Sequence, residues 1–256
     1  MTAHPLDVES TTNPRVKSWG ALGERRTRDL TRTFLIEGRR ETERALNHLI
    51  IEEVIWCPNY GNTPDVQGRP VTTVSQRVFD KVSRRQNPDG VAAVARTPDL
   101  SLMSFAPAPP ALVLVADGIE KPGNIGAILR TCDALGAAFL GSDLGTDIVN
   151  PNVIRAAQGS LYSTPMAVAS REDAIKWCTA NTTVLVAHMS GDASLWECNF
   201  TQPTSIVIGA EHSGVNGGWL EAGTPTMIPM VGAADSLNAS VSAAVFLAEA
   251  ARQRSL

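Results

Sequence analysis

The sequence lacks the features that would place it in a membrane, outside the cell or around a metal ion. No apolar run approaches the roughly eighteen residues that a membrane-spanning helix needs. The N-terminus has no basic segment followed by an apolar one, so no signal peptide is indicated. The four cysteines form no CxxC pair, which argues against a zinc site or a disulfide framework: Cys57, Cys132, Cys178 and Cys198. We therefore expect a cytoplasmic protein with reduced thiols and no metal.

Aromatic residues and net positive charge are also scarce. Aromatics make up 5% of the chain, and the formal net charge of −4 gives no general attraction to nucleic acid. The charge is uneven, however, because residues 15–44 carry nine basic and five acidic side chains. Such a local basic stretch is typical of a phosphate-binding surface. A solvated helix with i,i+4 ion pairs would show the same pattern, so composition leaves both explanations open.

The first part of the chain has the pattern of a small α/β unit. Short apolar runs predict strands in the FLIEG and RPVTTV segments and at 52–57 and 91–96. Helices are expected at about 39–48 and 75–83, and the Asn-Pro-Asp-Gly sequence at 87–90 predicts a turn. Four prolines between 98 and 110, with little periodicity, then predict a linker.

Beyond the linker the pattern predicts an α/β domain with a largely parallel sheet. Nearly continuous apolar runs, which fit strands covered on both faces, occur at 111–119, 137–143, 183–188 and 205–211, with a weaker run at 164–169. Helix-like segments alternate with them at 124–135, 152–158, 171–179, 219–222 and 237–252. Ligands of such folds bind beyond the C-terminal ends of the strands. Polar residues that follow the apolar runs are therefore candidates for a site.

Two glycine-containing motifs follow these runs. In EKPGNIGAILRTCDALGA (120–137), Asn124 is the expected N-cap of a helix, and Arg130 lies about two turns further on. In IGAEHSGV (208–215), Glu211 stands at the end of a strand. Neither motif has the residues of a P-loop or of a dinucleotide-binding turn, so ATP hydrolysis and nicotinamide chemistry are disfavoured. Taken singly, each is also typical of an ordinary glycine-rich turn.

A third motif, IPMVGAADSLNASVSAAVFLAEA (228–250), gathers hydroxyl and amide side chains ahead of a helix. Ser236 or Asn238 can cap that helix, but one cap explains only one of them. Taken together, N-x-G-x-x-x-R, I-G-x-E-x-x-G and I-P-M-x-G-x-x-x-S-L-N-x-S resemble the SpoU-TrmH family of RNA 2′-O-ribose methyltransferases, part of the SPOUT superfamily. The resemblance covers about 111–256. Its one departure is Ala239, where the family more often has valine.

The front of the chain, from Asn13 to Leu46, is similar to the N-terminal substrate-binding domain of that family, which resembles ribosomal protein L30e. The resemblance implies an RNA substrate-binding (L30e-like) domain at 1–97, a linker at 98–110 and a SpoU-type methyltransferase domain at 111–256. It further implies a parallel sheet with a C-terminal trefoil knot, S-adenosylmethionine as cofactor and a homodimer formed through the knotted domain. It calls for no metal.

The implied substrate is RNA, and large-subunit (23S-type) rRNA is favoured because tRNA-modifying relatives often lack the N-terminal domain. Three alternatives stay open: a tRNA 2′-O-methyltransferase, an antibiotic-resistance rRNA methyltransferase, and a non-catalytic RNA-binding or ribosome-assembly factor.

The resemblance also assigns residues. The implied catalytic set is Arg130, supported by Asn124, Glu211, Ser236 and Asn238. The implied cofactor contacts are Gly209, Ile228, Leu237, Met230, Ala187 and His188. The basic stretch provides the expected RNA-binding residues Arg25, Arg26, Arg28, Arg39 and Arg40. The family pattern calls for no histidine as a base, so we expect none of that chemistry from His188 or His212.

Arginine ordinarily stays protonated, so Arg130 is a poor base for a ribose 2′-OH. We expect it instead to hold the adjacent phosphate and orient the hydroxyl, while the phosphate or a water accepts the proton. Because the two subunits of the family build the site together, Arg130 is also able to act on the cofactor bound by the partner.

Overall fold

The structure is a computed structural model that describes residues 5–191, 193–211 and 213–255. The chain forms two compact units, Met1–Pro98 with Val149–Ile154, and Asp99–Ile148 with Arg155–Leu256. Each unit combines helices with its own β-sheet, so the α/β fold class expected from the sequence is confirmed. Among the described residues, no helix is long and apolar enough to cross a membrane.

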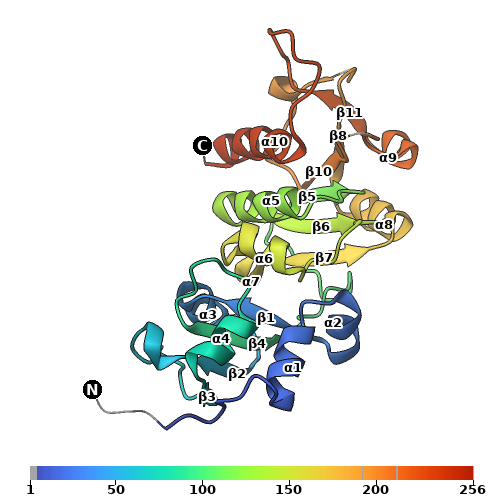
Figure 1. Ribbon diagram of the computed structural model, residues 1–256. Helices are drawn as coiled ribbons and strands as arrows, with labels where there is room; N and C mark the ends of the chain where they lie inside the picture. The colour runs from blue at the N-terminus through green and yellow to red at the C-terminus, as the bar shows by residue number, and fades with distance from the viewer. Residues whose placement is uncertain (1–4, 192, 212, 256) are drawn as a thin grey trace. The chain divides into compact units, whose positions relative to one another are not determined.

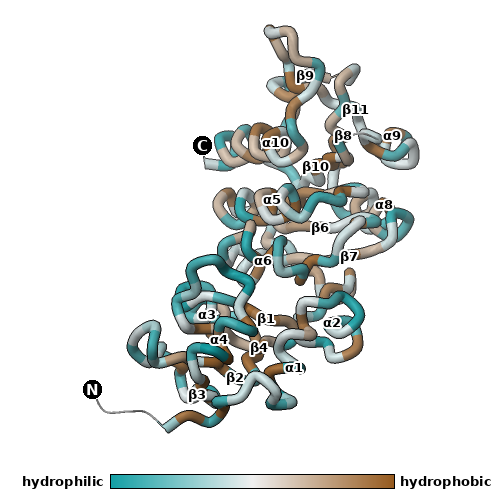
Figure 2. The backbone as a smooth tube through the Cα atoms, viewed as in Figure 1, coloured by the Kyte–Doolittle hydropathy of each residue, from teal (hydrophilic) through white to brown (hydrophobic). Residues whose placement is uncertain are grey.

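The first unit contains a four-stranded sheet in the order β1-β4-β2-β3. Its strands are β1 (Thr33–Glu37), β2 (Ile51–Trp56), β3 (Val71–Thr73) and β4 (Val91–Arg96). Strand β4 runs antiparallel to both neighbours, whereas β2 and β3 are parallel. Figure 2 shows hydrophobic residues along β1, β2 and β4, and these strands provide much of the buried core of the unit. The expected strands at 52–57 and 91–96 are confirmed, the first with a shift of one residue.

Four helices and a 3-10 turn accompany this sheet: α1 (Pro14–Ala21), α2 (Arg25–Thr31), α3 (Arg39–Leu46), η1 (Pro58–Tyr60) and α4 (Gln76–Val82). The sequence patterns predicted α3 and α4 but not α1 or α2. Helix α1 begins because the Asn13 side chain accepts a hydrogen bond from the Arg15 backbone N–H at 2.9 Å and Pro14 suits the first helical position. The Trp19 indole then donates to Glu53 of β2 at 2.7 Å, which fixes α1 to the sheet.

The second unit contains a seven-stranded sheet in the order β7-β6-β5-β10-β8-β11-β9. Its strands are β5 (Leu112–Asp117), β6 (Ala138–Ser142), β7 (Met166–Ala169), β8 (Thr183–Ala187), β9 (Ala193–Ser194), β10 (Thr204–Gly209) and β11 (Thr224–Met227). Every neighbouring pair is parallel. The five apolar runs of the sequence are thus strands of one parallel sheet, as expected. All residues of β5 and β6 are buried, which explains why these strands show no polar alternation.

Helices cover both faces of this sheet. Figure 1 shows α5 (Pro122–Leu135) beside α10 (Ala239–Arg254), with α8 (Arg171–Asn181) and α9 (Gly217–Ala222) on the opposite face. The remaining helical segments are α6 (Pro151–Ala157), whose residues up to Ile154 belong to the first unit, α7 (Ser160–Ser163) and the 3-10 turn η2 (Leu195–Glu197). All the helices expected in this part of the chain are present, with ends shifted by up to two residues.

One predicted helix cap is wrong. Helix α5 begins at Pro122, and Lys121 occupies the N-cap position without a side-chain cap bond. Asn124 therefore lies inside the first turn and not at the cap. Proline favours this earlier start, because its fixed φ suits a helix and its missing N–H needs no partner there. The amide of Asn124 is consequently free from capping and faces another partner.

Candidate active site

A cavity of about 560 Å³ opens at the C-terminal ends of β8, β10 and β11. The six residues that the sequence predicted as cofactor contacts all line it: Ala187, His188, Gly209, Ile228, Met230 and Leu237. Three of the predicted catalytic residues, Glu211, Ser236 and Asn238, line it as well. Asn124 and Arg130 are not among its described lining residues. The cavity lies where a parallel sheet is expected to bind a ligand, beyond the C-terminal ends of its strands.

The Glu211 carboxylate gathers three donors at the edge of this cavity. Its Oε1 accepts from Asn124 Nδ2 at 2.9 Å and from Asn238 Nδ2 at 2.5 Å, and its Oε2 forms an ion pair with Lys121. The Glu211 side chain is only 20% exposed. Donors to a charged acceptor make the stronger hydrogen bonds of proteins. This cluster therefore holds together the start of α5, the loop after β10 and the start of α10.

The Asn238 amide serves both the helix and the cluster. Its Oδ1 accepts from the Ser240 backbone N–H at 3.0 Å, which makes it the N-cap of α10, while its Nδ2 points to Glu211 and, at 3.3 Å, to Asn124 Oδ1. The prediction that Asn238 or Ser236 caps this helix is confirmed for Asn238. Ser236 instead lines the cavity. This division of roles explains why the segment before α10 contains more polar side chains than one cap requires.

Sequence reasoning missed Lys121, which the structure brings into contact with Glu211. The signal available was its position inside the first motif, directly before Pro122 and three residues before Asn124. A residue between a strand end and a helix start in an α/β fold faces the ligand edge of the sheet.

A tight turn presents Glu211 to the cavity. The Gly214 N–H donates to the Ala210 carbonyl at 2.9 Å, and Gly214 has a φ of +66°, a conformation that glycine adopts without strain. A Cβ atom on Gly209 would lie 2.3 Å from the carbonyl carbon and oxygen of Gly214, so a side chain there would force the turn open. Both glycines are thus required by the turn and not by a phosphate. His212 lies outside the described residues.

Arg130 stands apart from this cluster. It projects from α5 as an exposed side chain, and it makes no hydrogen bond or ion pair with any other residue that the structure describes. Its guanidinium group is therefore available to a ligand that comes from outside the subunit.

The five arginines predicted to bind RNA are in different surroundings. Arg25, Arg26 and Arg40 are exposed, and Arg25 lies 3.6 Å from Asp29 in an i,i+4 ion pair. Arg39 is half-buried and donates to the Asn62 carbonyl at 2.5 Å.

Arg28 does not fit the predicted role. It is 2% exposed, and its Nη1 donates to the Leu22 and Gly23 carbonyls at 2.8 Å each. Its guanidinium group therefore connects two segments of the first unit and is not presented to solvent. A phosphate could reach it only after the surrounding residues had moved.

The cavity suits a small cationic ligand such as S-adenosylmethionine. Its volume is within the usual range for small-molecule sites, roughly 300 to 1,000 Å³. Among its described lining residues Glu211 carries the only charge, and no lysine or arginine is present, which disfavours a polyphosphate. Met230 and Leu237, 40% and 37% exposed, leave apolar surface at the cavity that a bound ligand would cover. Within the described part of the chain, no group of His, Cys, Asp and Glu side chains could hold a metal ion.

Fold and site together define an α/β domain that binds a small molecule at the C-terminal edge of a parallel sheet, joined to a smaller α/β unit. Residues 111–248 match the SpoU rRNA Methylase family, and residues 13–93 match the MRM3-like substrate binding domain. The chain belongs to the SpoU rRNA methylase family, as the three sequence motifs predicted.

Individual relatives resemble the chain over nearly its whole length. It is 31% identical over 248 residues to the 23S rRNA (guanosine(2553)-2'-O)-methyltransferase RlmP of Bacillus subtilis, covering 94% of this chain and 97% of the relative. A crystal structure of an RNA 2'-O ribose methyltransferase is 43% identical, with a TM-score of 0.82 and coverage of 97% and 99%. The AdoMet-bound rRNA methyltransferase from Sinorhizobium meliloti is 31% identical, with a TM-score of 0.86 and coverage of 96% and 98%.

Proposed function

We propose that this protein transfers a methyl group from S-adenosylmethionine to a ribose 2′-OH of large-subunit (23S-type) rRNA. The observation that carries the proposal is the meeting of Asn124, Glu211 and Asn238 beside a cavity suited to the cofactor, in a chain of the SpoU family. The near full-length similarity to a 23S rRNA methyltransferase and the match of 13–93 to a substrate-binding domain support rRNA as the substrate.

The residues around the cavity bind and orient the cofactor in this proposal. Bound S-adenosylmethionine supplies a methyl group that its sulfonium already activates. Glu211 accepts hydrogen bonds at the edge of the cavity, and its three donors, with Lys121 balancing its charge, prevent the carboxylate from turning away. The exposed segment 229–238 contributes Met230 and Leu237, which cover apolar parts of the ligand.

Arg130 acts on the RNA and not on the cofactor. An exposed guanidinium without a partner among the described residues can make two parallel hydrogen bonds to a phosphate. Gripping the phosphate next to the target ribose places the 2′-OH for in-line attack on the methyl carbon. The proton of the hydroxyl then passes to that phosphate or to a water.

The first unit gives the protein its hold on RNA. We assign RNA substrate binding to residues 1–97, a linker to 98–110 and methyl transfer to 111–256. The exposed Arg25, Arg26 and Arg40 provide phosphate contacts. Arg39 contributes at most part of its guanidinium, because Asn62 already occupies one of its N–H groups. The expected place of action is the cytoplasm, with its rRNA.

We further propose a homodimer formed through the second unit, with the knotted C-terminus that the family resemblance implies. Three large apolar side chains are exposed in the second unit, and a second copy could cover them: Met189, Trp196 and Val231. Met189 also lines the cavity. The chain also returns from β11 to pack α10 against α5, past strands that lie between them in the sheet, which supports the knotted path. Light scattering of the purified protein tests the dimer.

Methyl transfer from tritiated S-adenosylmethionine to unmodified 23S rRNA, 16S rRNA and tRNA, supplied separately, tests the reaction and the substrate. We expect label in 23S rRNA and one alkali-resistant linkage, because a 2′-O-methyl group blocks alkaline cleavage. Label in tRNA or 16S rRNA alone would contradict the substrate assignment. A protein that binds the RNA but neither binds nor uses the cofactor would leave the non-catalytic alternative.

A further inference from the structure

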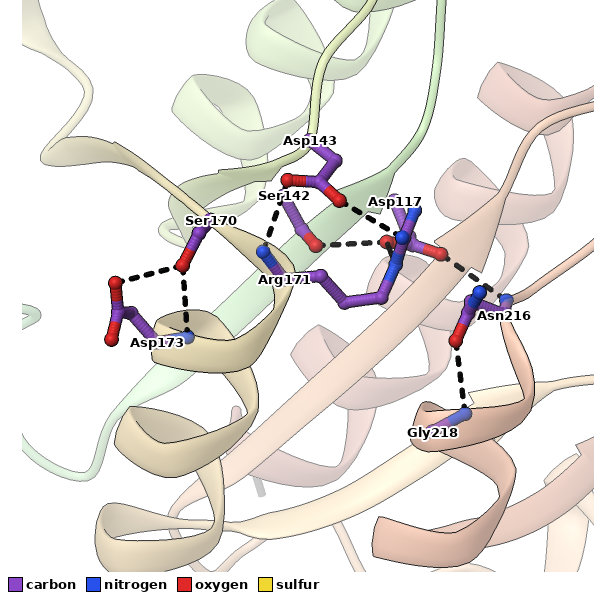
Figure 3. A network of polar contacts seen from close by, with 8 residues as sticks. All are labelled: Asp117, Ser142, Asp143, Ser170, Arg171, Asp173, Asn216 and Gly218. Atoms are coloured by element: carbon purple, nitrogen blue, oxygen red, sulfur yellow. Dashed lines mark hydrogen bonds and ion pairs between the residues drawn. The ribbon is translucent and has the colours of Figure 1, made fainter.

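A buried carboxylate that does not line the cavity lies close to the turn that carries Glu211. Asp117, the last residue of β5, is 2% exposed. Its Oδ1 accepts from Arg171 Nε at 2.8 Å and from Ser142 Oγ at 2.8 Å, and its Oδ2 accepts from the Asn216 backbone N–H at 3.2 Å. Figure 3 shows these donors reaching Asp117 from three separate segments. A buried charge with so many partners is fixed in direction, because any rotation would leave it unpaired.

Arg171 fixes the orientation of Asp117 from the first turn of α8. Its Nη1 forms an ion pair with Asp143 Oδ2 at 2.8 Å, and its backbone N–H donates to Asp143 Oδ1 at 3.1 Å. In Figure 3 its side chain extends from Asp143 to Asp117, with Asn216 on the far side of Asp117. One arginine thus joins two carboxylates at the ends of neighbouring strands, and its fork leaves little freedom to either of them.

Asp117 lies beside both ends of the segment 210–216. At the start of the segment, Gly209 is the sheet partner of Asp117 in the register of β10 and β5. At its end, the Asn216 N–H is bound by the Asp117 carboxylate, and the Asn216 side chain caps α9 through Gly218 N–H at 3.0 Å. Between these two points the segment makes the turn that presents Glu211.

We infer that Asp117, oriented by Arg171, is a positioning residue that holds the 210–216 turn in the shape needed for cofactor binding and methyl transfer. This inference rests on the proposed function. Asp117 is absent from the described lining of the cavity, so it acts through the turn and touches no ligand. Without the bond at Asn216, the turn keeps its connection to β10, its internal bond from Gly214 to Ala210 and the packing of Val215 against the core. The end of the turn is then less restrained, which loosens the position of the Glu211 backbone relative to Asn124 and Asn238.

Two substitutions at the same site separate positioning from stability. Asp117→Ala removes the acceptor of the Asn216 N–H. Asp117→Asn keeps one oxygen that can accept from the Asn216 N–H, but it loses the charge and turns an NH2 donor toward Arg171 and Ser142. We expect the dissociation constant for S-adenosylmethionine to rise about tenfold or more in Asp117→Ala, because a small misplacement of binding groups is costly. In Asp117→Asn it should rise by less than about half as much as in the alanine variant. Hydrogen exchange of the Asn216 amide in the protein without cofactor should accelerate in the same order.

A control variant weakens the fold without reaching the turn. Glu249→Gln disrupts a buried carboxylate paired with Arg252 in α10. It should lower the melting temperature, while the dissociation constant for the cofactor stays within about twofold of wild type, because the change removes no bond from the turn or from Asp117.

The outcomes are distinct. If Asp117→Ala does not fold, Asp117→Asn carries the comparison with Glu249→Gln. A folded Asp117 variant with wild-type affinity, and with unchanged exchange at Asn216, overturns the positioning role. It is overturned too if Glu249→Gln lowers the cofactor affinity as much as an Asp117 variant with the same loss of melting temperature. Absence of methyl transfer in the wild type, with cofactor binding intact, contradicts the proposed function alone, because affinity and amide exchange still test the turn.

Discussion

Substitution of Asn238 separates its two tasks, the capping of α10 and the contact with Glu211. Serine is as good an N-cap as asparagine, but its side chain is too short to reach the Glu211 carboxylate. Alanine can do neither. We therefore expect both variants to lose cofactor affinity and some stability, and Asn238→Ala to lose more stability than Asn238→Ser.

The magnitudes follow from the hydrogen bonds that each substitution removes. Removing the hydrogen bond from the Ser240 N–H to Asn238 costs about 1 kcal/mol in the free energy of unfolding, as for other caps. In a chain of this size that lowers the melting temperature by about 2 to 4 °C. Both substitutions also remove the bond to Glu211, which contributes about 1.5 to 3 kcal/mol to the free energy of unfolding, and we take the lower end because Asn238 is exposed and Glu211 keeps Lys121 and Asn124. Because Glu211 lines the cavity, we also expect the affinity for S-adenosylmethionine to fall about tenfold in both variants.

Titration calorimetry and thermal unfolding in the same buffer measure the two effects. The reasoning is refuted if Asn238→Ser loses as much stability as Asn238→Ala, since the cap would then not be responsible. It is refuted equally if Asn238→Ser keeps wild-type affinity, since the contact with Glu211 would then not matter to the site.

Three further changes test other parts of the molecule. Arg130→Ala should lower single-turnover methyl transfer at least about a hundredfold and leave cofactor affinity within about twofold, because we propose RNA and not the cofactor as its partner; a large loss of affinity would show that the role is wrong. Arg25→Glu with Arg26→Glu should weaken RNA binding. The slope of the logarithm of the binding constant against the logarithm of the salt concentration should become shallower by nearly one unit for each phosphate that the protein no longer neutralises, and an unchanged slope would show that these arginines do not contact RNA. Hydrogen bonding from Arg252 lowers the pKa of Glu249 to about 2, so ionised Glu249 stabilises the fold fully above the ordinary carboxyl range and loses this effect as the pH falls through 2. Glu249→Gln should remove that part of the loss of stability in acid. An unchanged dependence of the free energy of unfolding on acid pH would contradict this.

Much of the second unit could be predicted from local sequence. Its strands are buried on both faces, so their residues form nearly unbroken apolar runs, and β5, β6, β8 and β10 fall within one or two residues of the expected ranges. Strand β11 was not predicted, because its four residues include Pro225 and carry no apolar run. It pairs with β8 and β9 only because the tertiary structure places it there.

Two predictions failed, the exposure of Arg28 and the capping role of Asn124. Counting basic residues could not reveal that Arg28 turns inward to the Leu22 and Gly23 carbonyls, since its neighbours Arg25 and Arg26 look alike in sequence and face solvent. Cap preferences favoured Asn124 as the start of a helix that Pro122 begins two residues earlier. The sequence motifs nevertheless led to the residues around the cavity, because the family resemblance compares spacing across the whole domain.

The hydrogen bond between Asn238 and Asn124 joins positions 114 residues apart in the chain. This separation has a consequence for when the site is completed during synthesis. A chain is synthesised from its N-terminus, so the first unit and all seven strands of the parallel sheet are synthesised before Asn238. A polypeptide that stops before Leu237 lacks one of the three donors to Glu211 and the wall of the cavity that Leu237 provides. Such a fragment could hold RNA without modifying it. Only a chain that extends into α10 contains every group of the site, and its activity therefore depends on a segment that translation adds late.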